Sequence, residues 1–124
     1  MMQLFLQALQ VVVAVVLLVT WTVNFNRNTR FRGGDAKSMK QEFEVYGLPT
    51  QSVYVVGGLK IVASIGLLVG LAFPSIVPAS AAVIVLLMVG AFAMHIKIRD
   101  TIERTFPSAA ILTSSVLILL FSVS

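Results

Sequence analysis

Charged side chains are confined to two short parts of this sequence, and this confinement constrains the fold more than any other feature. Apart from Lys60, every Lys, Arg, Asp and Glu lies within residues 27–44 or 97–104. Charged residues make up 11% of the chain, against about 25% in a typical soluble domain. The apolar stretches between them are long enough to cross a bilayer as helices, which takes about 20 residues each. The sequence therefore predicts an all-α integral membrane protein.

The apolar stretches predict a bundle of four membrane-spanning helices. We expect these helices at about residues 3–24, 51–73, 79–96 and 107–123. The first stretch has neither the positive n-region nor the small-residue cleavage site of a signal peptide, so we expect it to be retained. A short uncharged link at residues 74–78 makes the second and third helices antiparallel neighbours, and Pro107 suits the first turn of the fourth. We expect a single membrane domain, residues 1–124.

The one long polar segment, residues 26–50, predicts a short amphipathic helix at about residues 35–46, between the first and second spans. Asp35 is a suitable N-cap, and Gly47 and Pro49 end the helix. Three apolar or aromatic residues recur on one helical face: Met39, Phe43 and Tyr46. Such a helix lies on the membrane surface or is tucked under the bundle.

The distribution of Lys and Arg predicts the orientation in the membrane. The connections at residues 26–50 and 97–106 contain all the loop Lys and Arg, namely Arg27, Arg30, Arg32, Lys37, Lys40, Lys97, Arg99 and Arg104. Residues 74–78 and the two ends of the chain have none. By the positive-inside rule, the two charged connections are cytoplasmic and both termini are periplasmic. This topology also explains the net charge of +4, so no nucleic-acid partner is expected.

A small set of polar residues near the predicted cytoplasmic half is the candidate binding site. Lys60 is isolated within a span, where a charged side chain normally faces protein or a water-filled cavity. His95 lies near the end of the antiparallel third helix, so the two side chains can approach each other. The remaining candidates are Asp100, Tyr54 and Ser64, with Glu42 and Glu44 as possible neighbours.

Each of the three main candidates also has a simpler explanation. Lys60 can extend to the cytoplasmic interface and do nothing more. His95 can be an ordinary interfacial residue, and Asp100 can cap a turn or pair with a neighbouring arginine. A functional site therefore requires that these side chains converge.

Familiar catalytic and metal-binding patterns are absent from the sequence. The chain has no cysteine and one histidine, which is too few for a thiol centre, a cysteine-linked haem or a histidine-rich metal site. The sequence has no Gly-x-Ser-x-Gly, Cys/His or His-Glu-x-x-His motif, and the glycines nearest a phosphate-loop pattern lie inside a predicted membrane helix. We therefore expect no covalently bound cofactor, no metal and no catalytic activity of its own, whereas contact with quinone or lipid is open.

Three short runs resemble the DoxX-like family of small bacterial and archaeal membrane proteins. They are Tyr46-Gly47-Leu48-Pro49, then Gly57-Gly58-Leu59-Lys60 with Gly66-Leu67-Leu68-Val69-Gly70, and Met94 to Asp100. The resemblance covers roughly residues 24–120 and implies four transmembrane helices in a bacterial inner membrane. The signature positions that it implies are Tyr46, Gly47, Pro49, Gly57, Lys60, His95 and Asp100. The family is named for a small subunit associated with thiosulfate:quinone oxidoreduction, but nothing else in the sequence indicates sulfur chemistry.

Three functional hypotheses follow from these observations. The first is a small accessory or structural subunit of a larger inner-membrane complex, such as a quinone-linked one, with other membrane subunits as partners. The second is a stand-alone membrane oxidoreductase component, or a protein that binds quinone or another small molecule, with Lys60 and His95 lining a pocket. The third is a small oligomeric transporter. Only the second and third require Lys60 to face a cavity.

Overall fold

A computed structural model describes residues 2–23, 25, 34 and 36–122, and this part of the chain is helical and contains no strand. Two short elements lie between the long helices: α2 (Met39–Val45) and the 3₁₀ turn η1 (Pro74–Ile76). The four long helices are α1 (Met2–Trp21), α3 (Thr50–Val69), α4 (Val77–Lys97) and α5 (Ile102–Ser122). The predicted all-α fold is confirmed.

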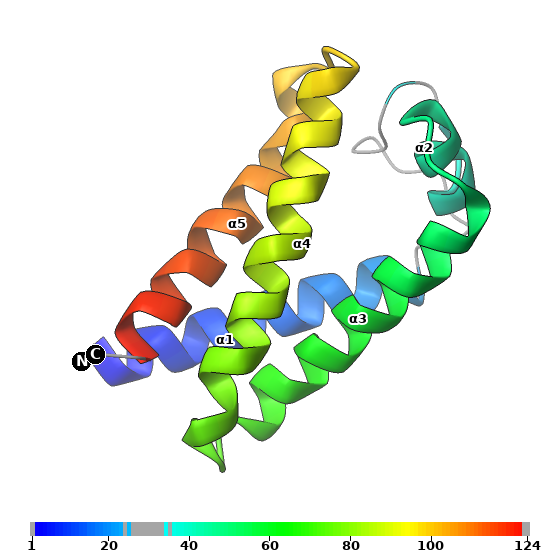
Figure 1. The fold of residues 1–124 in the computed structure, drawn as a ribbon. Helices are drawn as coiled ribbons and strands as arrows, with labels where there is room; N and C mark the ends of the chain where they lie inside the picture. The colour runs from blue at the N-terminus through cyan, green and yellow to red at the C-terminus, as the bar shows by residue number, and fades with distance from the viewer. Residues whose placement is uncertain (1, 24, 26–33, 35, 123–124) are drawn as a thin grey trace.

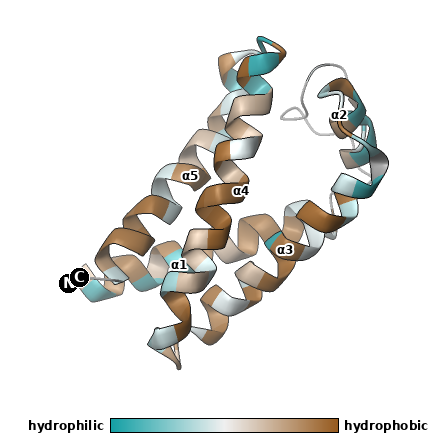
Figure 2. Ribbon diagram, in the orientation of Figure 1, coloured by the Kyte–Doolittle hydropathy of each residue, from teal (hydrophilic) through white to brown (hydrophobic). Residues whose placement is uncertain are grey.

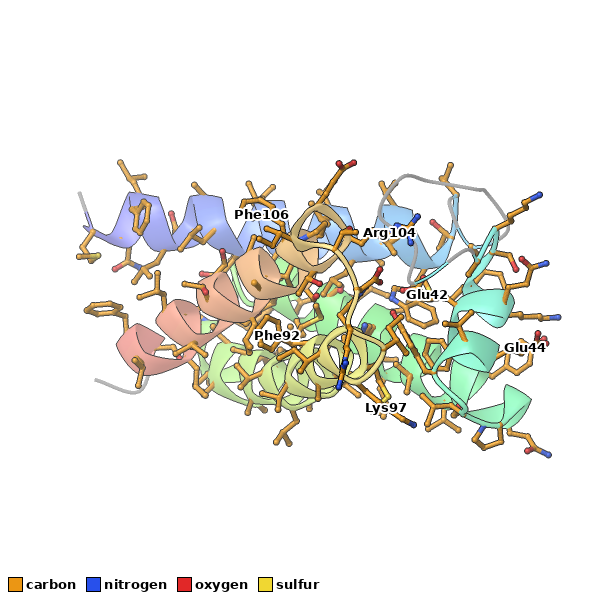
Figure 3. The ribbon with its side chains drawn as sticks, turned by 90° about the horizontal axis from the view of Figure 1, so that it is seen from above. Glu42, Glu44, Phe92, Lys97, Arg104 and Phe106 are labelled. Carbon is orange, nitrogen blue, oxygen red and sulfur yellow. The ribbon has the colours of Figure 1, made fainter. Side chains whose placement is uncertain are left out.

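All four long helices are long and apolar enough to cross a membrane. Their surfaces are mostly apolar, while polar residues gather on α2 and at the turn between α4 and α5 (Figure 2). The start of α1 and the end of α5 lie at the opposite end of the molecule from α2 (Figures 1 and 3). The chain is therefore a multi-pass membrane protein in which the polar residues of α2 and of the turn between α4 and α5 lie away from the start of α1 and the end of α5 (Figures 1 and 2).

The helices pack as two antiparallel pairs, α4 with α5 and α1 with α3, and further contacts of α3 with α4 and of α1 with α5 join the pairs (Figure 1). Between them lies the bundle core, a cluster of buried residues that includes Val13, Leu17, Leu67, Ala81, Ile84, Met88, Ile111 and Ile118. Lipid is as apolar as these side chains, so close packing has to hold the helices together. Gly66 lets α3 pack closely on α4, because a Cβ at this position would collide with the Ser80 hydroxyl of α4.

The short helix α2 occupies the predicted place but is shorter than predicted. It begins at Met39 rather than near residue 35, because Ser38 is its N-cap and accepts a hydrogen bond from the Gln41 backbone N–H at 3.3 Å. The predicted cap, Asp35, lies outside the described residues. Gly47 ends the helix with a φ of +80°, a conformation that glycine adopts without strain.

The long helices differ from their predicted bounds mainly at α5, which begins at Ile102, well before residue 107. Thr101 caps this earlier start, since its hydroxyl accepts a hydrogen bond from the Arg104 backbone N–H at 3.2 Å. Pro107 therefore lies inside the helix instead of in its first turn. The charged residues 103 and 104, which predicted a polar turn, form the first turn of this helix. α3 ends at Val69, short of Phe73.

Candidate functional site

A cavity of about 460 Å³ opens among α1, α2, α3, α4 and α5, at the end of the bundle that carries α2. Most of its wall is apolar or aromatic, with Leu17, Trp21, Phe43, Met88 and Met94 among the lining residues. Its polar lining residues are Thr20, Glu42, Tyr46, Lys60, His95, Arg104 and Ser108. The cavity thus combines an apolar wall with convergent polar groups, the usual composition of a small-molecule site.

Lys60 enters this cavity from α3 and is only 6% exposed. Its ammonium lies 5.0 Å from the ring centroid of Trp21 on α1, within the range of a cation–π contact. Gly57, one turn earlier on α3, makes room for that ring, because a Cβ there would come within 2.6 Å of it. Lys60 also interacts electrostatically with Glu42. The structure buries this lysine in the bundle instead of extending it to the interface.

Glu42, Tyr46, His95 and Asp100 form a continuous line of hydrogen-bonded side chains, which we call the polar chain. The Tyr46 hydroxyl lies 2.6 Å from Glu42 Oε1 and 3.2 Å from His95 Nε2. His95 Nδ1 lies 2.9 Å from Asp100 Oδ2. Glu42 lies in α2, Tyr46 is the C-cap of α2 one turn later, and His95 lies in the last turn of α4. The polar chain therefore joins the surface helix to the bundle.

Asp100 anchors the outer end of the polar chain. Its Oδ2 also accepts a hydrogen bond from the Gly34 backbone N–H, and its Oδ1 accepts from Thr101 N–H and lies 3.5 Å from Arg104 Nη1. Burial alone would raise the pKa of the Asp100 carboxyl, but the hydrogen bonds from His95, Gly34 and Thr101 outweigh burial and hold that pKa below its usual range. The ionised carboxylate then keeps the proton of His95 on Nδ1.

The turn after α4 brings Asp100 back under His95. Arg99 has a φ of +53°, in the left-handed region that non-glycine residues rarely adopt. This conformation lets the Asp100 backbone N–H donate to the His95 carbonyl at 2.9 Å. The positive φ of Arg99 therefore places the carboxylate next to the imidazole.

Contacts around Tyr46 hold α2 against the end of α4. Lys97 Nζ donates a hydrogen bond to the Tyr46 carbonyl at 2.9 Å. The Tyr46 and His95 rings meet edge to face with centroids 5.7 Å apart, and Phe43 packs in the same way on Trp21 at 5.9 Å. Figure 3 shows Glu42 pointing from α2 toward the other helices, while Glu44 points away.

Some residues predicted for the site lie elsewhere. Tyr54 is 56% exposed and lies near Phe25 and Lys40, outside the cavity lining. Ser64 is fully buried and donates to the Lys60 carbonyl at 2.7 Å, within its own helix. Pro49 is the N-cap of α3. Lys60 and His95 line the same cavity and Asp100 bonds to His95 from outside its wall, whereas Tyr54 and Ser64 are not part of the wall.

Three residues of the site were not singled out from the sequence as ligand-binding groups. Tyr46 was named on the apolar face of the predicted short helix and through the family resemblance, Arg104 was named only as a loop charge, and Trp21 was not named. The spacing of Glu42 and Tyr46, four residues apart, places both on one face of α2 and was the available signal. Among the described residues, no group of three acidic or histidine side chains is placed to hold a metal ion.

Comparison with known proteins identifies the family. The model of the DoxX-like family matches residues 8–119, which include all of the polar chain and most of every long helix. This chain belongs to the DoxX-like family. The resemblance seen in the three sequence runs is thereby confirmed. No curated protein and no solved structure matches this DoxX-like protein.

Proposed function

We propose that this DoxX-like protein binds a small amphipathic molecule that carries hydrogen-bond-accepting oxygens on its head group, and that a quinone is the candidate ligand. The observation that carries this proposal is the cavity itself, where polar groups face a mostly apolar space. The charged or ionisable residues of its wall are Glu42, Tyr46, Lys60, His95 and Arg104. Its volume of about 460 Å³ lies within the range of about 300–1,000 Å³ for small-molecule sites.

The polar lining supplies donors that suit carbonyl or anionic oxygens. The cavity wall contains the ammonium group of Lys60 and the guanidinium group of Arg104. An ammonium group has three hydrogen-bond donors and a guanidinium group has five. The apolar residues of α1 and α4 suit a ring or a short tail. A quinone combines such a ring with carbonyl acceptors, so its chemistry fits both parts of the wall.

The cavity favours the binding hypothesis over a purely structural role. A purely structural role does not explain why a buried lysine faces a cavity, whereas a ligand-binding role explains the lysine and the cavity together. The accessory-subunit role, with other membrane subunits as partners, stays a prediction, as does the transporter. Either role is compatible with a bound molecule.

Trp21 allows a direct binding test, because it is the one tryptophan of the chain and lines the cavity. Titrating a short-chain benzoquinone into the protein in nanodiscs should quench its fluorescence to saturation. Gly90 lines the cavity and Gly58 does not, and a Cβ at either meets open space. Gly90→Leu should therefore weaken binding at least tenfold, while Gly58→Leu leaves it unchanged. Linear, unsaturable quenching, or equal binding by both variants, would refute the proposal.

We also propose a bacterial inner-membrane location with both termini in the periplasm and the segments at 26–50 and 97–106 in the cytoplasm. The distribution of loop Lys and Arg supports this orientation. Lys37 and Ser75 are exposed near opposite ends of α3. With an impermeant thiol reagent on intact cells, Ser75→Cys should be labelled and Lys37→Cys should not. The reverse pattern would invert the topology.

A further inference from the structure

The hydroxyl of Tyr46 lies between two groups that both offer it a lone pair. It is within hydrogen-bond distance of Glu42 Oε1 and of His95 Nε2. A hydroxyl has one hydrogen and donates to one neighbour at a time, so for both hydrogen bonds to form the other neighbour must donate to it. One of the two neighbours therefore carries a proton on the atom that faces Tyr46.

Two proton arrangements satisfy both hydrogen bonds. In the first, His95 is doubly protonated and donates from Nε2 to the Tyr46 oxygen, and Tyr46 donates to ionised Glu42. In the second, Glu42 is protonated and donates to the Tyr46 oxygen, and Tyr46 donates to the bare Nε2 of neutral His95. Both arrangements hold the same number of protons, and in both the Nδ1–H of His95 points at Asp100.

We propose that Glu42, Tyr46 and His95 transfer a proton between the end of α4 and the cavity. The Nε2–H bond of His95 breaks as a new O–H bond forms on Tyr46, and the original Tyr46 O–H bond breaks as its proton binds Glu42 Oε1. Each bonding pair stays on the atom that loses the proton, so nothing is oxidised or reduced. Direct transfer is excluded at 3.8 Å, the distance from His95 Nε2 to Glu42 Oε1, and Tyr46 bridges that gap.

Charged groups next to the polar chain act on the two arrangements in opposite directions. In the described part of the chain, Lys60 faces Glu42 from α3 and Asp100 Oδ2 lies 2.9 Å from His95 Nδ1, so each ion of the first arrangement has an opposite charge beside it. Arg104 faces the cavity from α5, and Lys97 binds the Tyr46 carbonyl. The desolvation cost has the opposite effect. The side chains of His95 and Glu42 are only 6% and 11% exposed, so charging both of them is costly and the neutral arrangement is favoured.

The destination of the proton rests on the proposed function. Glu42 lines the cavity, so once protonated it can turn its O–H from Tyr46 to an acceptor oxygen of a bound head group, while Tyr46 still donates to His95 Nε2. A bound carbonyl then favours the arrangement in which the proton is on Glu42. Ligand binding and proton position are coupled through this one carboxyl.

His95 is the one histidine of the chain, so ¹⁵N NMR of histidine-labelled protein in nanodiscs reports on this site alone. Without ligand, the Nδ1 signal should be that of a protonated nitrogen, and the Nε2 signal should lie between the protonated and bare limits. Tyr46→Phe should shift Nε2 to one limit, whereas Tyr54→Phe, on the outer face, leaves it in place. Glu42→Gln should act like Tyr46→Phe, with Glu44→Gln as its control, so the test survives if one variant misfolds.

An Nε2 signal already at one limit in the wild type, or unmoved by both cavity variants, would overturn the proton transfer. Adding a short-chain benzoquinone should move the wild-type Nε2 signal toward the bare limit and leave Glu42→Gln unchanged. If Trp21 fluorescence shows quinone binding but the Nε2 signal does not shift, the coupling of the proton to the ligand through Glu42 would be wrong, and the proton transfer itself would not be affected. An intermediate Nε2 signal in a protein that does not bind quinone would support the proton transfer and contradict the proposed ligand.

Discussion

The bundle core and the polar chain satisfy their polar groups in different ways. In the bundle core, hydroxyls bond back within their own helix, as Ser115 does to the Ile111 carbonyl at 2.7 Å and Ser64 to that of Lys60. In the polar chain, side chains from α2 and α4 bond to each other. Hydrogen bonds within one helix leave the helix faces free for close packing. Hydrogen bonds between helices hold charged groups next to the cavity. The core therefore determines the fold, and the polar chain shapes the site.

The largest expected effect comes from breaking the close approach in the core. Gly66→Leu would drive a side chain into Ser80, and overpacking of this kind costs about 1–3 kcal/mol or more. Circular dichroism melts in detergent should show a large fall in the unfolding temperature. Gly90→Leu, at an open position, should melt close to the wild type. Similar melts for the two variants would remove the distinction between core and cavity.

Asp100→Asn should have the next largest effect, because it removes the charge that His95, Gly34 and Thr101 bind. Hydrogen bonds to charged groups contribute about 1.5–3 kcal/mol, so we expect a loss of roughly 2 kcal/mol in the free energy of unfolding. The pKa of Asp100 is lowered from its usual 3.8. Its contribution is therefore present above that value and is lost as the pH falls through the folded-state pKa.

The control for Asp100 is Glu44→Gln, an exposed carboxyl of α2, which should leave the melt unchanged. Between neutral and strongly acid pH, the difference between wild type and Asp100→Asn should shrink. A difference that grows with acid would contradict the lowered pKa.

Lys60→Met should weaken ligand binding while the helices stay intact. Met retains much of the stem volume and removes the donors, so the loss isolates the polar contribution. We expect about a tenfold increase in the dissociation constant, or roughly 1.4 kcal/mol, from the Trp21 titration. Lys37→Met, in the exposed segment before α2, is the matched control. Unchanged binding in Lys60→Met would reduce this lysine to a structural role.

The smallest expected effect is a gain in stability. Arg99 holds a positive φ, which costs a non-glycine residue about 1 kcal/mol. Arg99→Gly should therefore raise the free energy of unfolding by up to about 1 kcal/mol. Denaturant or thermal unfolding of the purified protein measures this change, and a destabilised variant would show that the arginine side chain contributes more than the strain removes.

The sequence predicted the fold well because membrane helices are specified by composition. Charges confined to residues 27–44 and 97–104 leave four apolar stretches, and these become the four long helices. The start of α5 was harder to predict, since Glu103 and Arg104 indicate a polar turn until Thr101 is known to cap a helix. Local hydrogen bonds, rather than hydropathy, decide that boundary.

The candidate site could be predicted only in part. The isolation of Lys60 and the antiparallel third helix were enough to bring Lys60 and His95 into one cavity. The position of α2 could not be predicted, because an amphipathic pattern does not show which helix the polar side chains will contact. Tyr54 was named as a possible member of the polar cluster, but its side chain is exposed and does not line the cavity.

The most direct test of the central claim is photolabelling with a light-activated quinone analogue in nanodiscs. Mass spectrometry of the digested protein should locate the label on the cavity-lining residues of α4 and α1, which are Leu86, Leu87, Met88, Gly90, Ala91 and Met94 and Val16, Leu17, Thr20 and Trp21. Gly90→Leu should lose this label, and excess short-chain quinone should compete for it. Labelling confined to the exposed outer faces, at residues such as Val12 and Val62, would show that the quinone is only dissolved in the surrounding lipid and that the cavity does not bind it.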